Sequence, residues 1–358
     1  MFVQPVPTLC RDGDSLLILD QTALPWQRRQ VRLRTLDEVA HAIRSMQVRG
    51  APLIGATAAM GLALALTRDG AEDTTLNHAL ALLAATRPTA VNLHWALQSM
   101  ASRLRPLPAA QRVTAAWAAA SAICADDAAT CEAIGEHGLA LLRTHPAQGG
   151  RPLRVMTHCN AGWLATLGAG TALAPVYAAH GAGIDIEVIV SETRPRNQGL
   201  LTAWELREAG VPHLLIADNA AGHLLMHGEV DVVITGADRI AANGDSANKV
   251  GTLLKALAAR AANVPFYIAA PHSTLDLACA DGAAIPIEDR GAAEVCSVTG
   301  PGAQEDGHPV TVQLAPPGTR TANPAFDVTP AALISGIITE RGVIAPSDLR
   351  AAYAGVNA

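Results

Sequence analysis

The first 145 residues consist mainly of long Ala- and Leu-rich segments whose apolar positions recur every three to four residues. This spacing places the apolar side chains on one face of a helix. One early stretch, LLILDQ at 16–21, has instead the continuous apolar character of a strand. The pattern predicts an α-rich part with a small β element, with helices at 36–47, 52–67, 75–85, 89–104, 108–126 and 128–144.

A different pattern begins after residue 150, where short β-rich runs alternate with helical segments. Strands separated by helices indicate βαβ units and a parallel sheet. No GxGxxG motif follows any of these runs, so the pattern predicts a Rossmann-like architecture without its dinucleotide variant. The predicted strands begin near residues 153, 186, 213, 230 and 265.

The run THPAQGGRP at 144–152 gathers Pro and Gly without apolar periodicity, which is typical of a linker. We therefore expect a mainly helical N-terminal domain with a small β element at 1–146 and a Rossmann-like catalytic domain at 150–358. Residues 298–323 are predicted as an extended surface loop. Residues 324–342 are predicted as strand, turn and helix, with a helix start at Pro330.

Half of the 358 residues are apolar, 16% are charged and the net charge is −6. This composition argues against a disordered chain and against a basic nucleic-acid-binding protein, and it gives no electrostatic reason to expect a membrane surface as partner. The apolar stretch at 51–66 is too short and Ala-rich for a membrane span, and 157–184 holds too many Gly and polar residues. We expect both to be packed interior.

The six cysteines are scattered without a CxxC pair, and no signal peptide precedes them. Free thiols in a reducing cytoplasm are the expectation. His223 and His227 are four residues apart, but HLLMH lacks the Glu of an HExxH motif, so we expect no zinc site there.

Ligands of open parallel sheets bind outside the carboxyl ends of the strands, so the residues after each run carry the candidate chemistry. Cys159 follows the run at 153–157, where we expect a helix to start. A helix N-terminus favours a thiolate, whereas apolar surroundings favour a thiol. A plain buried cysteine without chemistry is the alternative.

Asp238 ends the run at 230–235. It is expected either to pair with Arg239 or Lys249, to cap a helix, or to have a pKa high enough to serve as an acid. The following loop AANGDSANKVGT crowds Asn, Gly, Asp and Ser before a helix that Lys249 is predicted to open. Backbone N–H groups and a cation at such a place suit a phosphate.

A second anion site is indicated by Arg49, Gly50, Ala51 and Pro52, which combine a guanidinium, a flexible glycine and a proline in the first turn of a predicted helix. Arg87 in TRPTAVN is a similar candidate. A solvated surface arginine is the alternative at both positions.

At these stretches the sequence resembles the methylthioribose-1-phosphate isomerase family, the methionine-salvage members of a superfamily that includes regulatory subunits of the eukaryotic translation-initiation guanine-nucleotide exchange factor. The matching segments span nearly the whole chain in family order. They are LDQTALP, VRGAPLIGATAA, RPTAVNL, THCNAG, GTALAP, ETRPRNQG, LTAWEL, GADRIAANGDSANKVGT and NPAFDVTP.

The resemblance implies that Asp238 is the proton donor and Cys159 the second catalytic group. It implies a homodimer with an α-rich domain before a Rossmann-like domain, and neither a metal nor a nucleotide cofactor. Trp163 stands where the family has a small residue, so we expect it to narrow the pocket near Cys159. The implied substrate contacts are Arg49, Gly50, Ala51, Arg87, Gln198, Asn248 and Lys249.

The implied substrate is a small sugar phosphate, 5-methylthioribose 1-phosphate, and the implied product is the ketose 5-methylthioribulose 1-phosphate. Two routes are open for the hydrogen at C2: abstraction as a proton by a Cys159 thiolate, or transfer as hydride to C1. Other readings are a non-catalytic regulatory protein, an isomerase of ribose 1,5-bisphosphate, and additional activity on 5-deoxyribose 1-phosphate.

Overall fold

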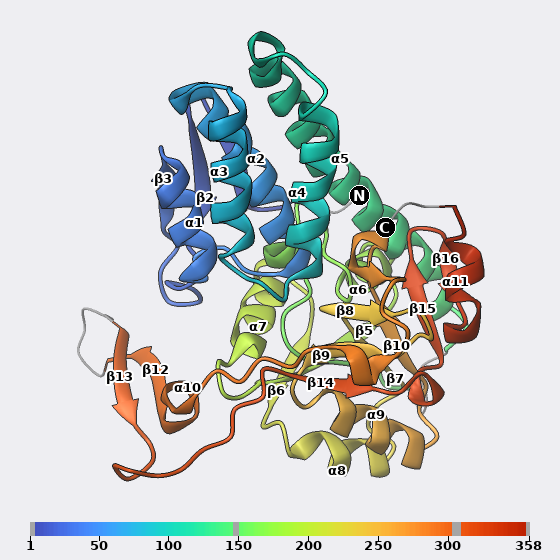
Figure 1. Ribbon diagram of the computed structural model, residues 1–358. Coiled ribbons are helices and arrows are strands. Elements are labelled where there is room, and N and C mark those ends of the chain that lie inside the picture. Colours follow the sequence, from blue (N-terminus) through green and yellow to red (C-terminus); the bar gives the residue numbers. More distant parts are fainter. Residues whose placement is uncertain (1–3, 146–149, 303–308, 356–358) are drawn as a thin grey trace.

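The computed structural model describes residues 4–145, 150–302 and 309–355. A helical first part lies above a β-rich second part, and one long helix, α5, runs along both (Figure 1). This is the mixed α/β fold, with a helical N-terminal region and a parallel-rich sheet, that the hydrophobic pattern predicts. The division into two domains is a separate prediction, and its expected boundary at 146–150 falls largely outside the described residues.

The first part opens with a small antiparallel sheet of strand order β1-β2-β3, formed by Leu9–Asp12, Ser15–Leu19 and Gln30–Leu33. Five helices follow it. They are α1 (Leu36–Arg44), α2 (Ala51–Asp69), α3 (Asp73–Ala84), α4 (Val91–Leu104) and α5 (Ala109–Leu142).

Helix α5 corrects one prediction, because it joins the two helices expected at 108–126 and 128–144 into one of 34 residues. The stretch around Asp126 and Asp127 is rich in Ala and holds neither Pro nor Gly, so nothing breaks the helix there. Asp127 accepts a hydrogen bond from the backbone of Leu167. The helix packs on α2 and α4 with its first part and also contacts α6, β15 and β16.

Helix α2 lies at the centre of the helical part, where α1, α3, α4 and α5 pack against it. A Cβ at Gly61 would lie 2.5 Å from Val39 on α1, and one at Gly55 would lie 2.7 Å from the Asn92 carbonyl on α4. Glycine at these positions therefore lets the helices approach closely. By length and composition α2 could cross a membrane, but most of it is buried inside the protein, as expected for a core helix.

The second part is built on a seven-stranded sheet of order β16-β15-β10-β7-β4-β5-β6, parallel except for β16. Each of the five predicted strand runs forms one of its strands. Counted along the chain, the six parallel strands have the spatial order 3-2-1-4-5-6, with the direction of winding reversing between β4 and β7. The strands are β4 (Leu153–Thr157), β5 (Ile186–Ser191), β6 (His213–Ile216), β7 (Val232–Thr235), β10 (Phe266–Ala269), β15 (Gly336–Thr339) and β16 (Gly342–Ile344).

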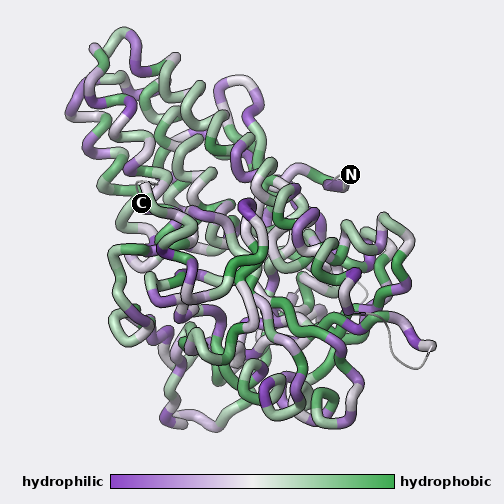
Figure 2. The backbone as a smooth tube through the Cα atoms, turned by 90° about the vertical axis from the view of Figure 1, so that its right-hand side faces the viewer, coloured by the Kyte–Doolittle hydropathy of each residue, from purple (hydrophilic) through white to green (hydrophobic). Residues whose placement is uncertain are grey.

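Helices cover both faces of this sheet. Alternate strand residues belong to two separate hydrophobic clusters, one including Val155 and Val188 and the other Met156 and Ile189, as expected for strands buried on both faces. Seen from the side in Figure 2, hydrophobic stretches run through the middle of the β-rich part. The helices are α6 (Ala174–Gly181), α7 (Gln198–Glu208), α8 (Ala220–Met226), α9 (Thr252–Ala261), and the short α10 (Ala292–Cys296) and α11 (Leu349–Ala352).

A second sheet of order β11-β8-β9-β14 lies beyond the carboxyl end of β7. It combines the loop after Asp238 with the NPAFDVTP segment, because β9 pairs antiparallel with both β8 and β14. Its strands are β8 (Arg239–Ala241), β9 (Ser246–Lys249), β11 (Leu275–Asp276) and β14 (Phe326–Thr329).

Two predictions in the last third of the chain are wrong in part. Within 298–323, expected as a loop, β12 (Ser297–Pro301) and β13 (Pro309–Gln313) form a hairpin that projects from the molecule (Figure 1). Within 324–342, the expected helix after Pro330 is a single 3-10 turn at Ala331–Leu333, and the next apolar run becomes β15. That run, GIIT, is short and β-branched, and it extends the buried sheet.

Candidate active site

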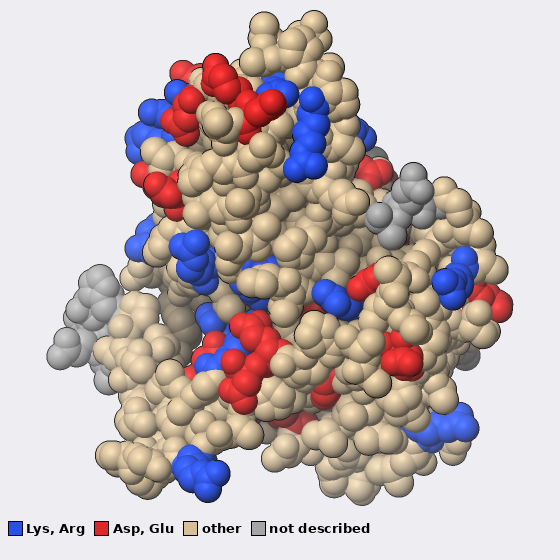
Figure 3. Space-filling view, viewed as in Figure 1, with Lys and Arg blue, Asp and Glu red and all other residues tan. Residues whose placement is uncertain are grey.

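A cavity opens at the carboxyl edge of the large sheet, facing the N-terminus of α2. Cys159 follows β4 and Asp238 follows β7, so the two candidate catalytic groups flank the point where the winding reverses, which is where ligands of such sheets bind. On the face shown in Figure 3, acidic and basic side chains gather near a hollow between the helical part and the projecting hairpin. All nine expected site residues line the cavity: Arg49, Gly50, Ala51, Arg87, Cys159, Gln198, Asp238, Asn248 and Lys249.

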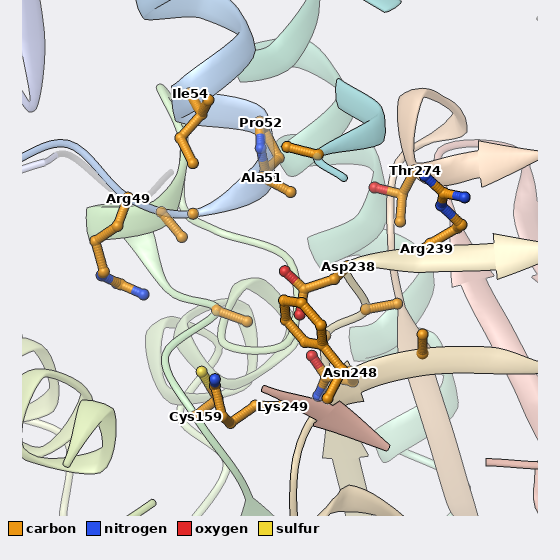
Figure 4. Close-up of a pocket in the computed structure, with 18 of the residues that line it drawn as sticks. Arg49, Ala51, Pro52, Ile54, Cys159, Asp238, Arg239, Asn248, Lys249 and Thr274 are labelled. Atoms are coloured by element: carbon orange, nitrogen blue, oxygen red, sulfur yellow. The ribbon is translucent and has the colours of Figure 1, made fainter. Parts of the chain in front are cut away.

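Arg49 approaches from one side of the cavity, Asp238 lies in the middle, and Cys159, Asn248 and Lys249 lie below it (Figure 4). The structure thus brings together residues from five separate segments of the chain. It also adds lining residues that were not expected to contact the substrate. Among these are His158, Thr171, Arg239, Arg290 and Phe326, of which only Arg290 lies outside the quoted motifs.

Cys159 lies in a tight turn after β4, with a left-handed backbone of φ +65°. Its N–H donates to the Thr193 hydroxyl at 2.9 Å, and its carbonyl accepts from the Thr202 hydroxyl at 2.8 Å. The expected helix start is wrong, because the next helical residues are the 3-10 turn Trp163–Ala165. The helix N-terminus expected at Cys159 itself is therefore absent.

Burial raises the pKa of the Cys159 thiol, while the positive charges of Lys249 and Arg49 oppose this rise. Burial is the larger effect, and it favours the neutral thiol over the thiolate. Of the two opposing influences that the sequence left open, the apolar surroundings prevail.

Asp238 is partly buried, and its backbone N–H donates to the Ala247 carbonyl at 2.9 Å. Burial raises the pKa of its carboxyl group, against the lowering charges of Lys249, Arg87, Arg290 and Arg49. The expected partners are engaged elsewhere: Arg239 bonds the Thr89 carbonyl and pairs with Asp276, and Lys249 donates to the Ala325 carbonyl. The Asp238 carboxyl makes no hydrogen bond or ion pair with any described residue.

Lys249 ends strand β9 and does not open a helix as predicted, because α9 begins at Thr252. The loop before it is a β-hairpin of β8 and β9. Asp238 directly precedes β8 and Lys249 ends β9, so the hairpin brings both to the same cavity. Only 4% of Lys249 is exposed; burial lowers its pKa. Its neighbour Asn248 donates to the Thr252 hydroxyl at 3.0 Å.

Gly50 is the N-cap of α2 and has φ +94°, a conformation that L side chains rarely adopt. A Cβ there would lie 2.5 Å from Ala165 Cα, so the backbone passes the 3-10 turn without room for a side chain. Helix α2 starts at Ala51, one residue before the predicted start at 52, and Pro52 lies in its first turn as predicted. Its first N–H groups have no intrahelical partner and are suited to an anion.

Arg49 donates from Nε to Gln21 Oε1 at 2.9 Å and from Nη1 to the Asn160 carbonyl at 3.2 Å. Its Nη2 is buried and bonds no described residue. Gln198 is the first residue of α7, and its Oε1 is likewise buried without a partner. Both atoms are available to a bound ligand.

Trp163 does not narrow the cavity as expected. It is fully buried, stands outside the cavity lining and packs on Trp204 with a ring separation of 5.6 Å. Its place is the hydrophobic cluster behind the Cys159 turn. In the described part of the chain, no three His, Cys, Asp or Glu side chains are grouped as metal ligands would be.

The sequence matches the model of the initiation factor 2 subunit family over residues 47–346. It is 61% identical over 332 residues to a methylthioribose-1-phosphate isomerase of Dechloromonas aromatica. The aligned region covers 93% of this chain and 91% of that protein. The chain is 57% identical over 339 residues to the protein of the same name from Acidiphilium cryptum, covering 94% and 91% of the two chains.

Two crystal structures share the fold over nearly the whole chain. The 5-methylthioribose 1-phosphate isomerase from Pyrococcus horikoshii OT3 has a TM-score of 0.83 at 36% identity and covers 97% of this chain and 95% of its own. The translation initiation factor eIF-2B subunit delta from A. fulgidus has a TM-score of 0.78 at 36% identity, with 96% and 97% covered.

Proposed function

This chain belongs to the initiation factor 2 subunit family, and we propose that it converts 5-methylthio-α-D-ribose 1-phosphate to 5-methylthio-D-ribulose 1-phosphate in methionine salvage. It is an aldose–ketose isomerase. The observation that carries this function is the 54–61% identity to methylthioribose-1-phosphate isomerases over at least 92% of the chain. The convergence of Cys159 and Asp238 on one cavity supports the same reaction.

The phosphate on the anomeric oxygen of this substrate prevents the spontaneous ring opening that ordinary aldose isomerases use. The enzyme must therefore open the ring itself by protonating the ring oxygen. A carboxylic acid whose pKa is raised by burial is suited to this step, and Asp238 is such a group. The C1–O bond of the ring then breaks, which leaves an oxocarbenium-like C1.

Substrate orientation depends on the groups that surround Asp238. The free Nη2 of Arg49 and the N-terminus of α2 provide donors for the phosphate, and Lys249 and Arg87 add positive charge. The free Oε1 of Gln198 is suited to accept a hydrogen bond from a hydroxyl group of the sugar. Asn248 directly precedes Lys249 at the end of strand β9, and both residues line the cavity.

The hydrogen at C2 must reach C1, and the neutral state of Cys159 supports its transfer as hydride. As the C2–H electron pair moves to C1, the C2 hydroxyl becomes the ketone and releases its proton. The Cys159 thiol relays this proton to the Asp238 carboxylate, which regains the proton that it gave to the ring oxygen. The alternative enediol route requires a Cys159 thiolate, which burial disfavours.

Two other activities fit the fold less well. The interpretation as a regulatory protein rests on the eIF-2B relative. Its identity of 36% equals that of the P. horikoshii isomerase but lies well below the 54–61% of the bacterial isomerases, and its TM-score is lower, 0.78 against 0.83. A ribose 1,5-bisphosphate isomerase would need a second cationic cluster for the 5-phosphate. The cavity wall instead includes apolar side chains suited to a methylthio group, among them Met46, Ile54, Ala90 and Ile285.

We also propose a homodimer. The edge strand β6 exposes Leu214 and Leu215, and the nearby helices α8 and α9 expose Met226 and Leu254, at 42–67% of their surface. An apolar strand edge left open in this way favours pairing with a second copy. A monomeric mass for the wild type in light scattering would contradict the dimer, and Leu254→Glu is expected to shift a dimeric mass towards the monomer.

A cytoplasmic location and the division into domains at 1–146 and 150–358 belong to the same proposal. All six cysteines are free thiols, which supports a reducing compartment. Limited proteolysis that releases stable fragments on either side of residues 146–149 is the result expected of two domains.

The test of the function is direct. Purified protein is incubated with 5-methylthioribose 1-phosphate, and ketose formation is followed by NMR for the wild type, Cys159→Ala and Asp238→Asn. Conversion by the wild type alone is expected. A folded wild type that fails to convert this substrate, and instead binds a protein partner or isomerises the bisphosphate, would overturn the proposal.

A further inference from the structure

We propose that Arg290, a residue outside the motifs of the site, binds the phosphate group of the substrate together with Arg87. The inference rests on the proposed function for the identity of the substrate. It depends on three observations: the placement of the Arg290 side chain, the contact that Arg290 and Lys249 both make with the Phe326 ring, and the excess of positive charge in the cavity.

Arg290 belongs to the segment that crosses the cavity after the 3-10 turn Gly282–Ala284. Its backbone N–H donates to the Asn323 carbonyl at 3.0 Å, which fixes the segment against the loop before β14. Its side chain lines the cavity and is only 8% exposed. The buried Nε bonds no described residue, so this guanidinium is held in place with a donor free.

The ring of Phe326 connects Arg290 to a residue already expected to bind substrate. Lys249 Nζ lies 5.0 Å from the ring centroid, and Arg290 Cζ lies 5.7 Å from the same centroid. Both cations are therefore stabilised by one aromatic side chain in the cavity wall. This contact places Arg290 beside Lys249 and not at a separate surface site.

Positive charge exceeds negative charge in the cavity. Arg87 and Arg290 line the same cavity. Burial lowers the pKa of Arg87, and the positive charge of Arg290 lowers it further. Glu288 is the one described acid that pairs with Arg290, at 3.5 Å, and it is 37% exposed. Buried cations that repel one another require an anion, and two guanidinium forks suit the oxygens of a phosphate.

The experiment compares the wild type with Arg290→Gln and Arg290→Lys. Steady-state kinetics on 5-methylthioribose 1-phosphate are measured, together with thermal unfolding at increasing concentrations of inorganic phosphate. Removing a charge-assisted hydrogen bond to phosphate should raise KM about 10- to 100-fold in Arg290→Gln, with a smaller change in kcat. Arg290→Lys keeps the positive charge but not the planar guanidinium, which can bind two phosphate oxygens at once, so an intermediate KM is expected.

Phosphate should raise the Tm of the wild type, and this rise should be lost in Arg290→Gln. The matched control is Glu288→Gln, which removes the ion-pair partner of Arg290 but changes no residue of the cavity lining. It should keep the wild-type KM and the wild-type response to phosphate.

Three results would overturn the inference. These are a KM increase in Glu288→Gln equal to that in Arg290→Gln, equal stabilisation of the wild type and Arg290→Gln by phosphate, or no stabilisation of either. The phosphate titration needs no turnover. A wild type that binds phosphate through Arg290 but does not convert the substrate would therefore refute the proposed function, while the role of Arg290 in binding phosphate would stand.

Discussion

The backbone N–H of Cys159 donates to the Thr193 hydroxyl at 2.9 Å, and both residues have a left-handed backbone, with φ of +65° and +67°. This conformation is rare outside glycine and is an outlier for a β-branched residue such as Thr193. Such residues cost about 1–3 kcal/mol each and persist where the surroundings hold them. Here Thr193 Oγ1 donates to the Ser191 carbonyl at 2.9 Å, and its N–H donates to Asp218 at 2.8 Å.

Thr193→Val should therefore impair catalysis although Thr193 is outside the cavity lining. Valine has the same shape but cannot accept the Cys159 N–H, which leaves a donor unpaired and the turn less defined. We expect the free energy of unfolding to fall by about 1–3 kcal/mol and kcat to fall by about tenfold or more. Urea unfolding and kinetics measure the two effects. Thr193→Ser keeps the hydroxyl and should retain most activity; full kcat in Thr193→Val would contradict the role.

A pH dependence of stability is expected from Glu205, which is fully buried behind the Cys159 turn and accepts the Leu164 N–H. Burial raises its pKa from 4.5 to about 7, although the charge of Arg49 opposes this. Below pH 4.5 the group is protonated in both the folded and the unfolded chain. As pH rises from there to about 7, the unfolded chain ionises first, and stability is lost.

The difference between pKa values of 4.5 and about 7 corresponds to about 3 kcal/mol. Glu205→Gln should remove this loss, so the variant gains stability relative to the wild type at pH 8 but not at pH 4.5. Urea unfolding at both pH values measures it. Asp127, whose pKa burial also raises to about 7, contributes independently, and Asp127→Asn should show the same pattern. Parallel stability curves for wild type and Glu205→Gln would refute the shift.

The gathering of Cys159 and Asp238 could be predicted because it follows from strand order. Buried parallel strands appear in the sequence as continuous apolar runs, and whatever follows each run reaches the same sheet edge. The motif at Arg49 could be placed for a similar reason, since Pro52 marks the first turn of a helix. Local sequence patterns therefore predicted most of the residues that line the cavity.

The predictions that were wrong concern features that are determined by contacts between distant segments of the chain. The turn at Cys159 is held by Thr193 and Thr202, so no helix forms where the local sequence indicated one. Lys249 ends a strand because β9 pairs with Phe326–Thr329, more than 70 residues later. Arg290 reaches the cavity through a segment without helical or strand periodicity, so no local pattern identified it.

Gly50→Ala should be severely destabilising. The new Cβ would lie 2.5–2.8 Å from the Cα, Cβ and carbonyl oxygen of Ala165, and the residue would keep φ +94°. Because backbone atoms cannot move aside without a large cost, we expect the loss of unfolding free energy to exceed about 3 kcal/mol, together with loss of activity.

The control is Gly228→Ala, at a glycine with φ +72° where an added Cβ would have no atom within 4 Å. Its free energy of unfolding should fall by only about 1 kcal/mol. Equal losses of the two variants in urea unfolding would mean that the close approach of Gly50 to Ala165 does not contribute to the cost of the substitution.

The fate of the substrate hydrogen tests the state of Cys159. Because burial favours the neutral thiol, substrate with deuterium at C2 should give product with that deuterium at C1 in ordinary water, as measured by NMR. A thiolate acting as base would exchange deuterium with solvent during its transfer. A sequestered base could retain it over one turnover, so incubation continues long after equilibrium, when repeated forward and reverse passages make even slow exchange visible. Cys159→Ser, which keeps a proton relay, should turn over slowly with full retention. Progressive washout in the wild type would establish the enediol route and the thiolate that it requires.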